Sequence, residues 1–361
     1  MQVGVAKGIA ERWVHDVASE MPGFAGAFFH GGVTWLPDAA ELPATSDLDL
    51  IIVVDGSLPD VKLGKLRVES VLLDVTYLPR DEVRSAEHVL GQYHLAGSLA
   101  GSRVVADPTG ELTGLQADVA DGYPRRSWVR RRAEQARDKV LAAPPLREED
   151  APADQVTGWN FPAGVLTHVL LVAALRNPTV RTRYLAARDT LADYGRLDLY
   201  PALLDLQGCR GWTPELAMRH LEAVAEAFDA ASAVVRTPVF YATDISPAAR
   251  PIAIDGSRDL IARGDHHEAV FWIVATACRC QTILAADAPE EAERFAPAFR
   301  ELLADLGITS FADLQRRRAE TTALVPAVWA AAETIMVANP KIHDDARSPL
   351  PQLWETSLRR G

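Results

Sequence analysis

Residues 25–54, AGAFFHGGVTWLPDAAELPATSDLDLIIVV, carry the strongest structural signal in the chain. It predicts an apolar strand, a glycine pair, a loop, and a second apolar strand that opens with two carboxylates. In an extended segment successive side chains alternate faces, so Asp47 and Asp49 point the same way while Leu48 and Leu50 enter a core. The β-branched run that follows is nearly unbroken, which is typical of a strand covered on both faces. Such a strand would hold the two acids rigidly side by side.

A divalent cation is the simplest explanation of this acid pair. Neighbouring carboxylates raise each other's pKa unless a positive charge neutralises them, and Mg²⁺ prefers oxygen ligands. Gly31 and Gly32 follow the first strand, where the lack of a Cβ lets backbone N–H groups approach a phosphate. Ser46 adds a hydroxyl beside the first acid. Either motif alone is more often a solvated turn, but their order predicts a metal and nucleotide-phosphate site.

A third acid lies in a later β-rich run. The segment at 71–78, VLLDVTYL, puts Asp74 in the middle of a strand, where a carboxylate is unfavourable unless it has a partner. With the residues before it, this run predicts a hairpin over 63–78 that turns near Glu69. Lys62 and Lys65 precede the run and could reach a triphosphate. We expect instead that they are solvated lysines of an edge strand.

These motifs resemble those of one enzyme superfamily. A small-residue pair after a strand, then D-x-D, then a third acid on a neighbouring strand is similar to the nucleotidyltransferases of the DNA polymerase β type. Within that superfamily, FFHGG, SDLDLIIV and LLDVTYLP most resemble the aminoglycoside adenylyltransferases. The resemblance implies that Gly31 and Gly32 bind phosphate. It also implies that Asp47 and Asp49 are metal ligands and that Asp74 is the third acid.

The chain departs from the family pattern at three points. Gly32 stands where the family often has Ser, which removes one hydroxyl contact to phosphate. The spacer over 33–46 is longer than usual. Asp74 stands where the antibiotic-modifying members carry Glu, so its reach is shorter.

Composition limits the class of protein. The chain has 361 residues, 48% of them hydrophobic, so two domains could each bury a core. Its net charge of −12 argues against a nucleic-acid partner and is compatible with a small cationic substrate. Its 3 cysteines are too few for a disulfide framework. The chain shows no signal-peptide pattern, and its apolar runs fall short of a membrane span, so we expect a cytoplasmic enzyme without a membrane partner.

The pattern along the chain predicts an α+β fold in two parts. The first part, at 1–142, is the nucleotidyltransferase domain with a mixed sheet flanked by helices that the resemblance implies. A linker at 143–155, rich in proline and charge, follows it. An α-helical bundle at 156–340 and an irregular tail at 341–361 complete the chain. Within the bundle, helical periodicity predicts helices at 163–175, 179–194, 214–235, 265–286, 290–306 and 310–338.

Histidine and cysteine offer two weaker candidates. Cys278 and Cys280 lie near His266 and His267 in sequence, but an i, i+2 pair on a helix does not face one point, so we expect buried side chains rather than a zinc site. His30, beside the glycine pair, could touch a nucleotide or could equally be packed or bonded to a backbone carbonyl.

The resulting expectation is Mg²⁺-dependent transfer of a nucleoside monophosphate to a hydroxyl group. Asp47 and Asp49 would hold Mg²⁺ against the phosphates, and Asp74 would bind a second metal ion or take the acceptor's proton. The resemblance implies ATP as co-substrate and a small, aminoglycoside-like acceptor bound under the helical bundle. Two alternatives stay open. One is transfer to a protein hydroxyl, and the other is a catalytically silent nucleotide-binding or partner-binding module, which Gly32 and the long spacer favour.

Overall fold

The computed structural model describes residues 1–58 and 62–345 and shows an α+β protein. A five-stranded mixed sheet has the strand order β3-β4-β2-β1-β5. The strands are β1 (Phe24–Phe29), β2 (Leu48–Val54), β3 (Gly64–Val68), β4 (Val71–Pro79) and β5 (Val104–Ala106). Inside the sheet β2 and β4 run parallel, whereas the other neighbouring pairs are antiparallel. The expected strands and the β3–β4 hairpin are confirmed.

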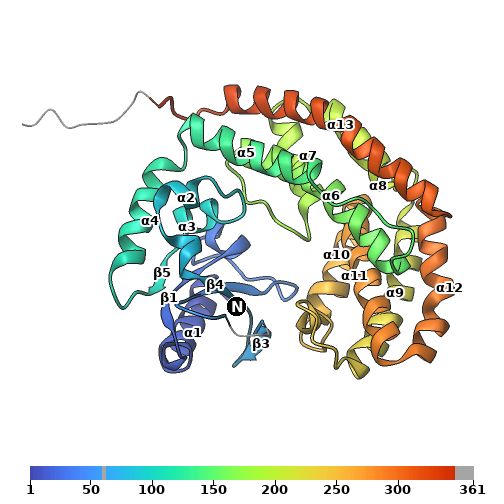
Figure 1. Cartoon of the computed structure of the whole chain (residues 1–361), viewed down its shortest axis with the longest axis horizontal. Coiled ribbons are helices and arrows are strands. Elements are labelled where there is room, and N and C mark those ends of the chain that lie inside the picture. The colour runs from blue at the N-terminus through green and yellow to red at the C-terminus, as the bar shows by residue number, and fades with distance from the viewer. Residues whose placement is uncertain (59–61, 346–361) are drawn as a thin grey trace, which may run out of the picture.

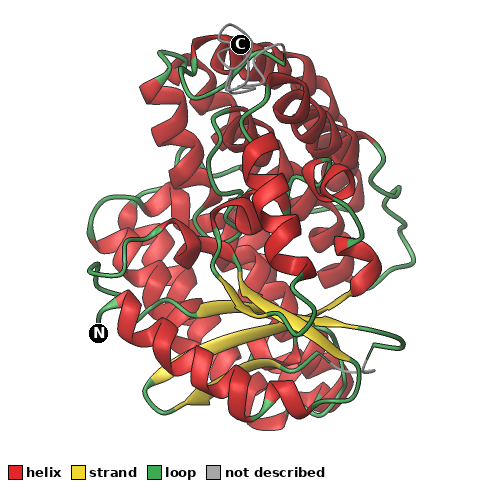
Figure 2. Ribbon diagram, turned by 90° about the vertical axis from the view of Figure 1, so that its left-hand side faces the viewer, coloured by secondary structure: helices red, strands yellow, loops and turns green. Residues whose placement is uncertain are grey.

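Strand β2 is covered on both faces, as its apolar run predicts. Leu48, Leu50 and Ile52 lie in one buried cluster together with the apolar side of the first helix. Ile51 and Val53 point the other way, into a cluster formed with the helices that follow the sheet. Figure 2 shows helices on both sides of the strands. These helices are α1 (Val3–Asp16), α2 (Ala86–Leu90), α3 (Ala96–Gly101) and α4 (Glu111–Gly122), with 3-10 segments η1 (Ala18–Glu20), η2 (Gly31–Trp35) and η3 (Arg80–Val83).

The rest of the described chain is helical. Figure 1 shows α5 and α13 across the top of the view, with α9 to α12 in the right-hand part, where α10 lies nearest the sheet. The helices are α5 (Arg126–Leu141), α6 (Pro152–Ala173), α7 (Arg183–Asp193), α8 (Tyr200–Gln207), α9 (Pro214–Val234), α10 (Gly256–Ala262), α11 (His266–Asp287), α12 (Pro289–Asp305) and α13 (Phe311–Ala338). Short segments η4 (Leu197–Leu199), η5 (Ala242–Asp244) and the π-helical η6 (Pro251–Asp255) connect them.

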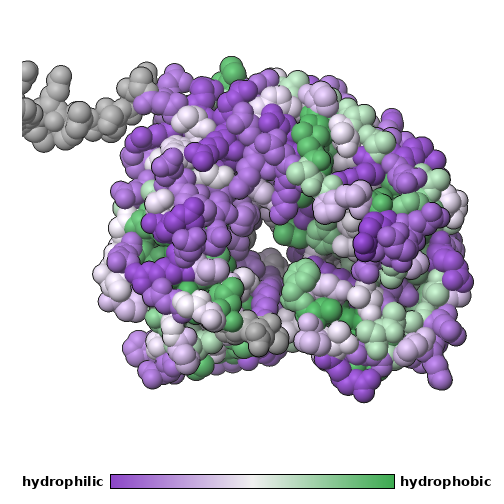
Figure 3. Space-filling view, in the orientation of Figure 1, coloured by the Kyte–Doolittle hydropathy of each residue, from purple (hydrophilic) through white to green (hydrophobic). Residues whose placement is uncertain are grey.

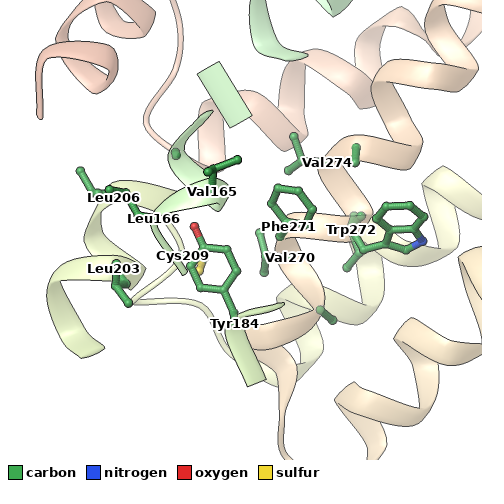
Figure 4. Packing of buried hydrophobic residues seen from close by; sticks show 14 of the residues in the cluster. Val165, Leu166, Tyr184, Leu203, Leu206, Cys209, Val270, Phe271, Trp272 and Val274 are labelled. Atoms are coloured by element: carbon green, nitrogen blue, oxygen red, sulfur yellow. The ribbon is translucent and has the colours of Figure 1, made fainter. Parts of the chain in front are cut away.

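The six helices expected from periodicity are present, and α8 and α10 are additional. Both are short, so they present too few turns for a periodic pattern to stand out. In the core of this part, Tyr184 of α7 packs against Phe271 of α11, with ring centroids 6.1 Å apart. Figure 4 shows Leu166 and Cys209 close to the same rings. This buried apolar cluster holds the helical part together as one body.

The apolar core divides the chain at a different place from the expected boundary at 142. Val129, Ala133 and Val140 of α5 lie in the core of the helical part, where α5 packs against α6 and α13. Helix α6 begins at Pro152, inside the expected linker at 143–155. Most of the expected tail, 346–361, lies outside the described residues.

Three helices, α6, α11 and α13, are long and apolar enough to cross a membrane, judged by length and composition alone. Within the protein, 78% of the apolar window of α6 and 72% of that of α11 is buried, against 39% for α13. These helices extend beyond the apolar runs seen in the sequence. The expectation that no apolar segment is long enough to span a membrane is therefore wrong by length and composition. The absence of a membrane partner stays a prediction.

A hollow separates the sheet from the helical part. It is visible near the centre of Figure 3, with the part that carries the sheet on the left and the helical part on the right. Polar contacts from both sides reach across this region. Lys65 of β3 donates its backbone N–H to Thr243 Oγ1 (3.1 Å), and Arg181 Nη2, before α7, lies 3.4 Å from the Thr45 carbonyl.

Candidate metal and phosphate site

Parallel pairing of β2 with β4 brings the predicted acids together. Asp49 lies directly opposite Asp74 in the register of these strands, and Asp47 immediately precedes β2. One carboxylate oxygen from each of the three acids lies within 4.8 Å of the others. Of all the histidines, cysteines and acids in residues 1–58 and 62–345, this is the group that could hold a metal ion. The structure therefore brings the three acids together, and metal binding by them stays a prediction.

The glycine pair meets the acids through Gly31. This residue opens η2 with φ at +64°, and a Cβ built on it would lie 2.0 Å from Asp49 Oδ2. Its N–H donates to Ser98 Oγ (3.2 Å), so the expected phosphate donor has a partner within the protein. Gly32 is far less restricted, because the nearest atom to a Cβ there is Asn177 Nδ2 at 3.8 Å. The pair is thus asymmetric: Gly31 shapes the acid cluster, and Gly32 faces the helical part.

Ser46 has a local role in the loop before β2. Its backbone N–H donates to the Pro43 carbonyl (3.0 Å), which closes a turn directly ahead of Asp47. This places Ser46 next to the first acid, as the sequence requires. Contact of its hydroxyl with a phosphate stays a prediction.

The expectation of solvated lysines is wrong for Lys65. Its side chain is only 8% exposed, and its Nζ donates to Asp47 and to Asp74 Oδ2, the latter at 2.6 Å. Lys62 Nζ lies 2.7 Å from Asp74 Oδ1. The physical reason is cross-strand pairing: Lys65 lies directly opposite Asp74 in the antiparallel β3–β4 hairpin, so the two side chains share one face.

The helical part contributes a fourth acid that the sequence did not single out. Asp244 in η5 has Oδ1 3.4 Å from Lys65 Nζ, and its Oδ2 accepts from Arg279 Nη1 of α11 at 3.0 Å. The preceding Thr243 seats η5 on β3, where a Cβ on Gly64 would lie 2.0 Å from its Oγ1. Asp244 is remote in sequence and lies in a proline-containing segment without periodicity, so no local signal could have identified it.

The electrostatics of the cluster are uneven. Burial and the charges of Asp47 and Asp74 raise the pKa of Asp49 well above the usual range. Burial also opposes ionisation of Asp74, but the ammonium groups of Lys65 and Lys62 outweigh it and lower the pKa of Asp74. Of the three acids, Asp49 is the one without an ion pair to any described residue, and a cation bound beside it would relieve this imbalance.

His30 and the cysteines behave differently from a ligand set. His30 Nδ1 is buried without a hydrogen-bond partner among the described residues, and burial together with nearby His94 lowers the pKa of His30 to about 4. Cys278 and Cys280 are buried in α11, as expected, and burial raises the pKa of the Cys278 thiol to about 12. His266 Nε2 lies 3.0 Å from a backbone carbonyl oxygen, that of Trp212. Among the described residues, the candidate metal ligands are the three acids Asp47, Asp49 and Asp74.

No protein-family model matches the sequence, and no curated protein matches it either.

Proposed function

We propose that the chain is a Mg²⁺-dependent nucleotidyltransferase that acts in the hollow between the sheet and the helical part. It would transfer a nucleoside monophosphate, AMP from ATP by the family resemblance, to a hydroxyl of a small acceptor. The observation that carries this proposal is the convergence of Asp47, Asp49 and Asp74 within 4.8 Å beside the left-handed Gly31.

The donor set fits a hard divalent cation. All three groups offer carboxylate oxygens, which Mg²⁺ prefers over nitrogen or sulfur. The raised pKa of half-buried Asp49 supports a positive partner for it, because an ionised carboxylate removed from water without one is unfavourable. Bound Mg²⁺ would supply charge neutralisation for the departing pyrophosphate. Asp47 and Asp49 would hold it, and Asp74 would either bind a second ion or accept the proton of the attacking hydroxyl.

The acceptor would lie on the helical side of the acids. Ligand sites commonly form where two parts of a chain face each other, and residues of η5 and of the segment before α7 reach this region. An aminoglycoside-like acceptor is favoured by the family resemblance and is compatible with the net charge of −12. A cationic, hydroxyl-rich small molecule is thus the acceptor class to test first.

A second function is favoured by Lys65. Its ammonium forms ion pairs with both Asp47 and Asp74, and the N–H of Gly31 is engaged by Ser98. Both features would suit a catalytically silent module that binds a nucleotide or a partner. Such a module would need no divalent cation to keep its acids together.

The test is a pyrophosphate-release assay with Mg²⁺, each of the four nucleoside triphosphates, and a panel of aminoglycosides, simple sugars and no acceptor. We expect release that requires one acceptor and is lost in Asp47→Asn. The matched control is Asp118→Asn, which removes an exposed acid of α4 and should leave release unchanged. Nucleotide binding without release from any combination would favour the silent module, and retained release in Asp47→Asn would refute the role of the acids.

A further inference from the structure

Lys65 already holds two of the three carboxylates that would bind a cation. Its Nζ donates to both Asp47 and Asp74, two of the three candidate ligands, and the oxygens of the cluster lie within 4.8 Å of one another. A Mg²⁺ ion sits about 2.1 Å from its oxygen ligands. Because Lys65 Nζ is 2.6 Å from Asp74 Oδ2, an ion bound to the same oxygen would be close to the ammonium group and repelled by its charge. The two cations compete for the same carboxylates.

The ammonium group has another carboxylate within reach. Asp244 Oδ1 lies 3.4 Å from Lys65 Nζ, on the helical side of the hollow. Arg279 fixes Asp244 through its other oxygen, and Thr243 holds this segment on the backbone of β3. A lysine side chain has several rotatable bonds, so its Nζ can change partner without movement of the strand.

We infer that Lys65 is an internal cation that competes with the divalent metal ion for Asp47 and Asp74, and that its ammonium transfers to Asp244 when the metal ion binds. This inference rests on the proposed function, because it concerns the same acids. It assigns Lys65 and Asp244 as positioning residues that set the affinity of the site for its ion.

The first consequence is that removing the ammonium strengthens metal binding. Charges of +2 and +1 about 4 Å apart repel each other enough, even with the screening of water, to lower affinity more than about tenfold. Lys65→Met keeps the apolar stem and removes this charge. Lys62→Met is the matched control, because it removes the same charge from a lysine that contacts Asp74 alone among the three acids.

The measurement is Mn²⁺ binding to the full chain, followed by the electron paramagnetic resonance signal of the free ion, with Mg²⁺ as competitor. We expect Lys65→Met to bind Mn²⁺ at least about tenfold more tightly than the wild type, and Lys62→Met to gain clearly less. Asp47→Asn identifies the site, because it should lose this binding. Circular dichroism melting of each variant verifies that it is folded.

The second consequence concerns Asp244. Asp244→Asn should weaken Mn²⁺ binding several-fold in the wild type, since the displaced ammonium loses its alternative partner, but not in the Lys65→Met background. This double-mutant cycle separates an effect that acts through Lys65 from a direct effect on the ion. An equal loss in both backgrounds would refute the transfer to Asp244.

Failure of this inference is distinguishable from failure of the proposed function. Equal or weaker Mn²⁺ binding by Lys65→Met, with pyrophosphate release intact in the wild type, would overturn the competition and leave the enzyme standing. No Mn²⁺ binding by any variant, together with no release, would overturn both.

Discussion

Replacement of Gly31 by alanine tests whether backbone geometry holds the acid cluster together. Gly31 has φ at +64°, and its missing Cβ would lie 2.0 Å from Asp49 Oδ2 and 2.8 Å from Asp49 Cγ. No L-residue Cβ tolerates such contacts, so the Asp49 carboxylate must rotate away. The left-handed conformation adds about 1–2 kcal/mol for a residue with a side chain.

We therefore expect Gly31→Ala to lower the free energy of unfolding by about 2 kcal/mol and to weaken Mn²⁺ binding about tenfold or more, since one carboxylate of the cluster is displaced. Urea unfolding measures the first effect, and titration of the free-ion signal measures the second. The neighbouring Gly32→Ala is the control. Its φ is not in the left-handed region and its Cβ would find 3.8 Å to the nearest atom, so both quantities should stay close to wild type.

The reasoning fails if the two variants bind Mn²⁺ with the same affinity. That result would mean that Asp49 keeps its place despite the added methyl group, or that it does not ligate the ion. Mn²⁺ binding by Asp49→Asn separates these cases, because an unchanged affinity there would show that Asp49 does not ligate the ion.

Three further predictions follow from burial and charge. Asp49→Asn should abolish metal-dependent transfer while the urea midpoint stays or rises, because burial and neighbouring acids disfavour the native charge; a clear fall in the midpoint would contradict this. Burial and nearby His94 lower the pKa of His30 from 6.5 to about 4 in the folded protein. The free energy of unfolding should therefore be highest above pH 6.5 and fall by about 3 kcal/mol as the pH is lowered to 4, because the unfolded chain binds a proton over this range that the folded chain does not. An equally steep decline in His30→Asn would point to other groups. Arg132→Met should lower the free energy of unfolding, measured with urea, by about 3 kcal/mol, because the buried guanidinium donates to two backbone carbonyls. Arg131→Met removes an exposed arginine and should leave this free energy almost unchanged.

Part of the candidate site could be derived from local sequence. Alternation along β2 places Leu48 and Leu50 in the core and turns Asp49 away from them, and the structure confirms this. The position of Lys65 was also within reach. A two-residue turn after Val68 fixes the hairpin register, and counting back from it sets Lys65 opposite Asp74. The prediction of a solvated lysine failed because it weighed edge-strand statistics above this register.

The sequence predicted the long helices themselves, but it did not predict which helices belong to the core of the helical part. Periodicity identifies the long helices because each has one apolar side over several turns. Which core a helix joins depends on its packing partners, and α5 packs with α6 and α13 although the proline-rich segment after it suggests a boundary. A composition change marks a loop, but it does not show which side of that loop the preceding helix packs against.

Local sequence is enough to place a strand with two acids at its start, a glycine pair after another strand, and a third acid in a hairpin. The parallel pairing of β2 with β4, which sets Asp49 opposite Asp74, depends on tertiary packing, because nothing local selects among possible strand neighbours. Tertiary packing alone also decided that Thr243 meets Lys65 across 178 residues of chain and brings Asp244 to the acids. Contacts of this kind depend on how whole elements pack. The free energy of that packing comes from many residues of the buried cores, so no short motif predicts it.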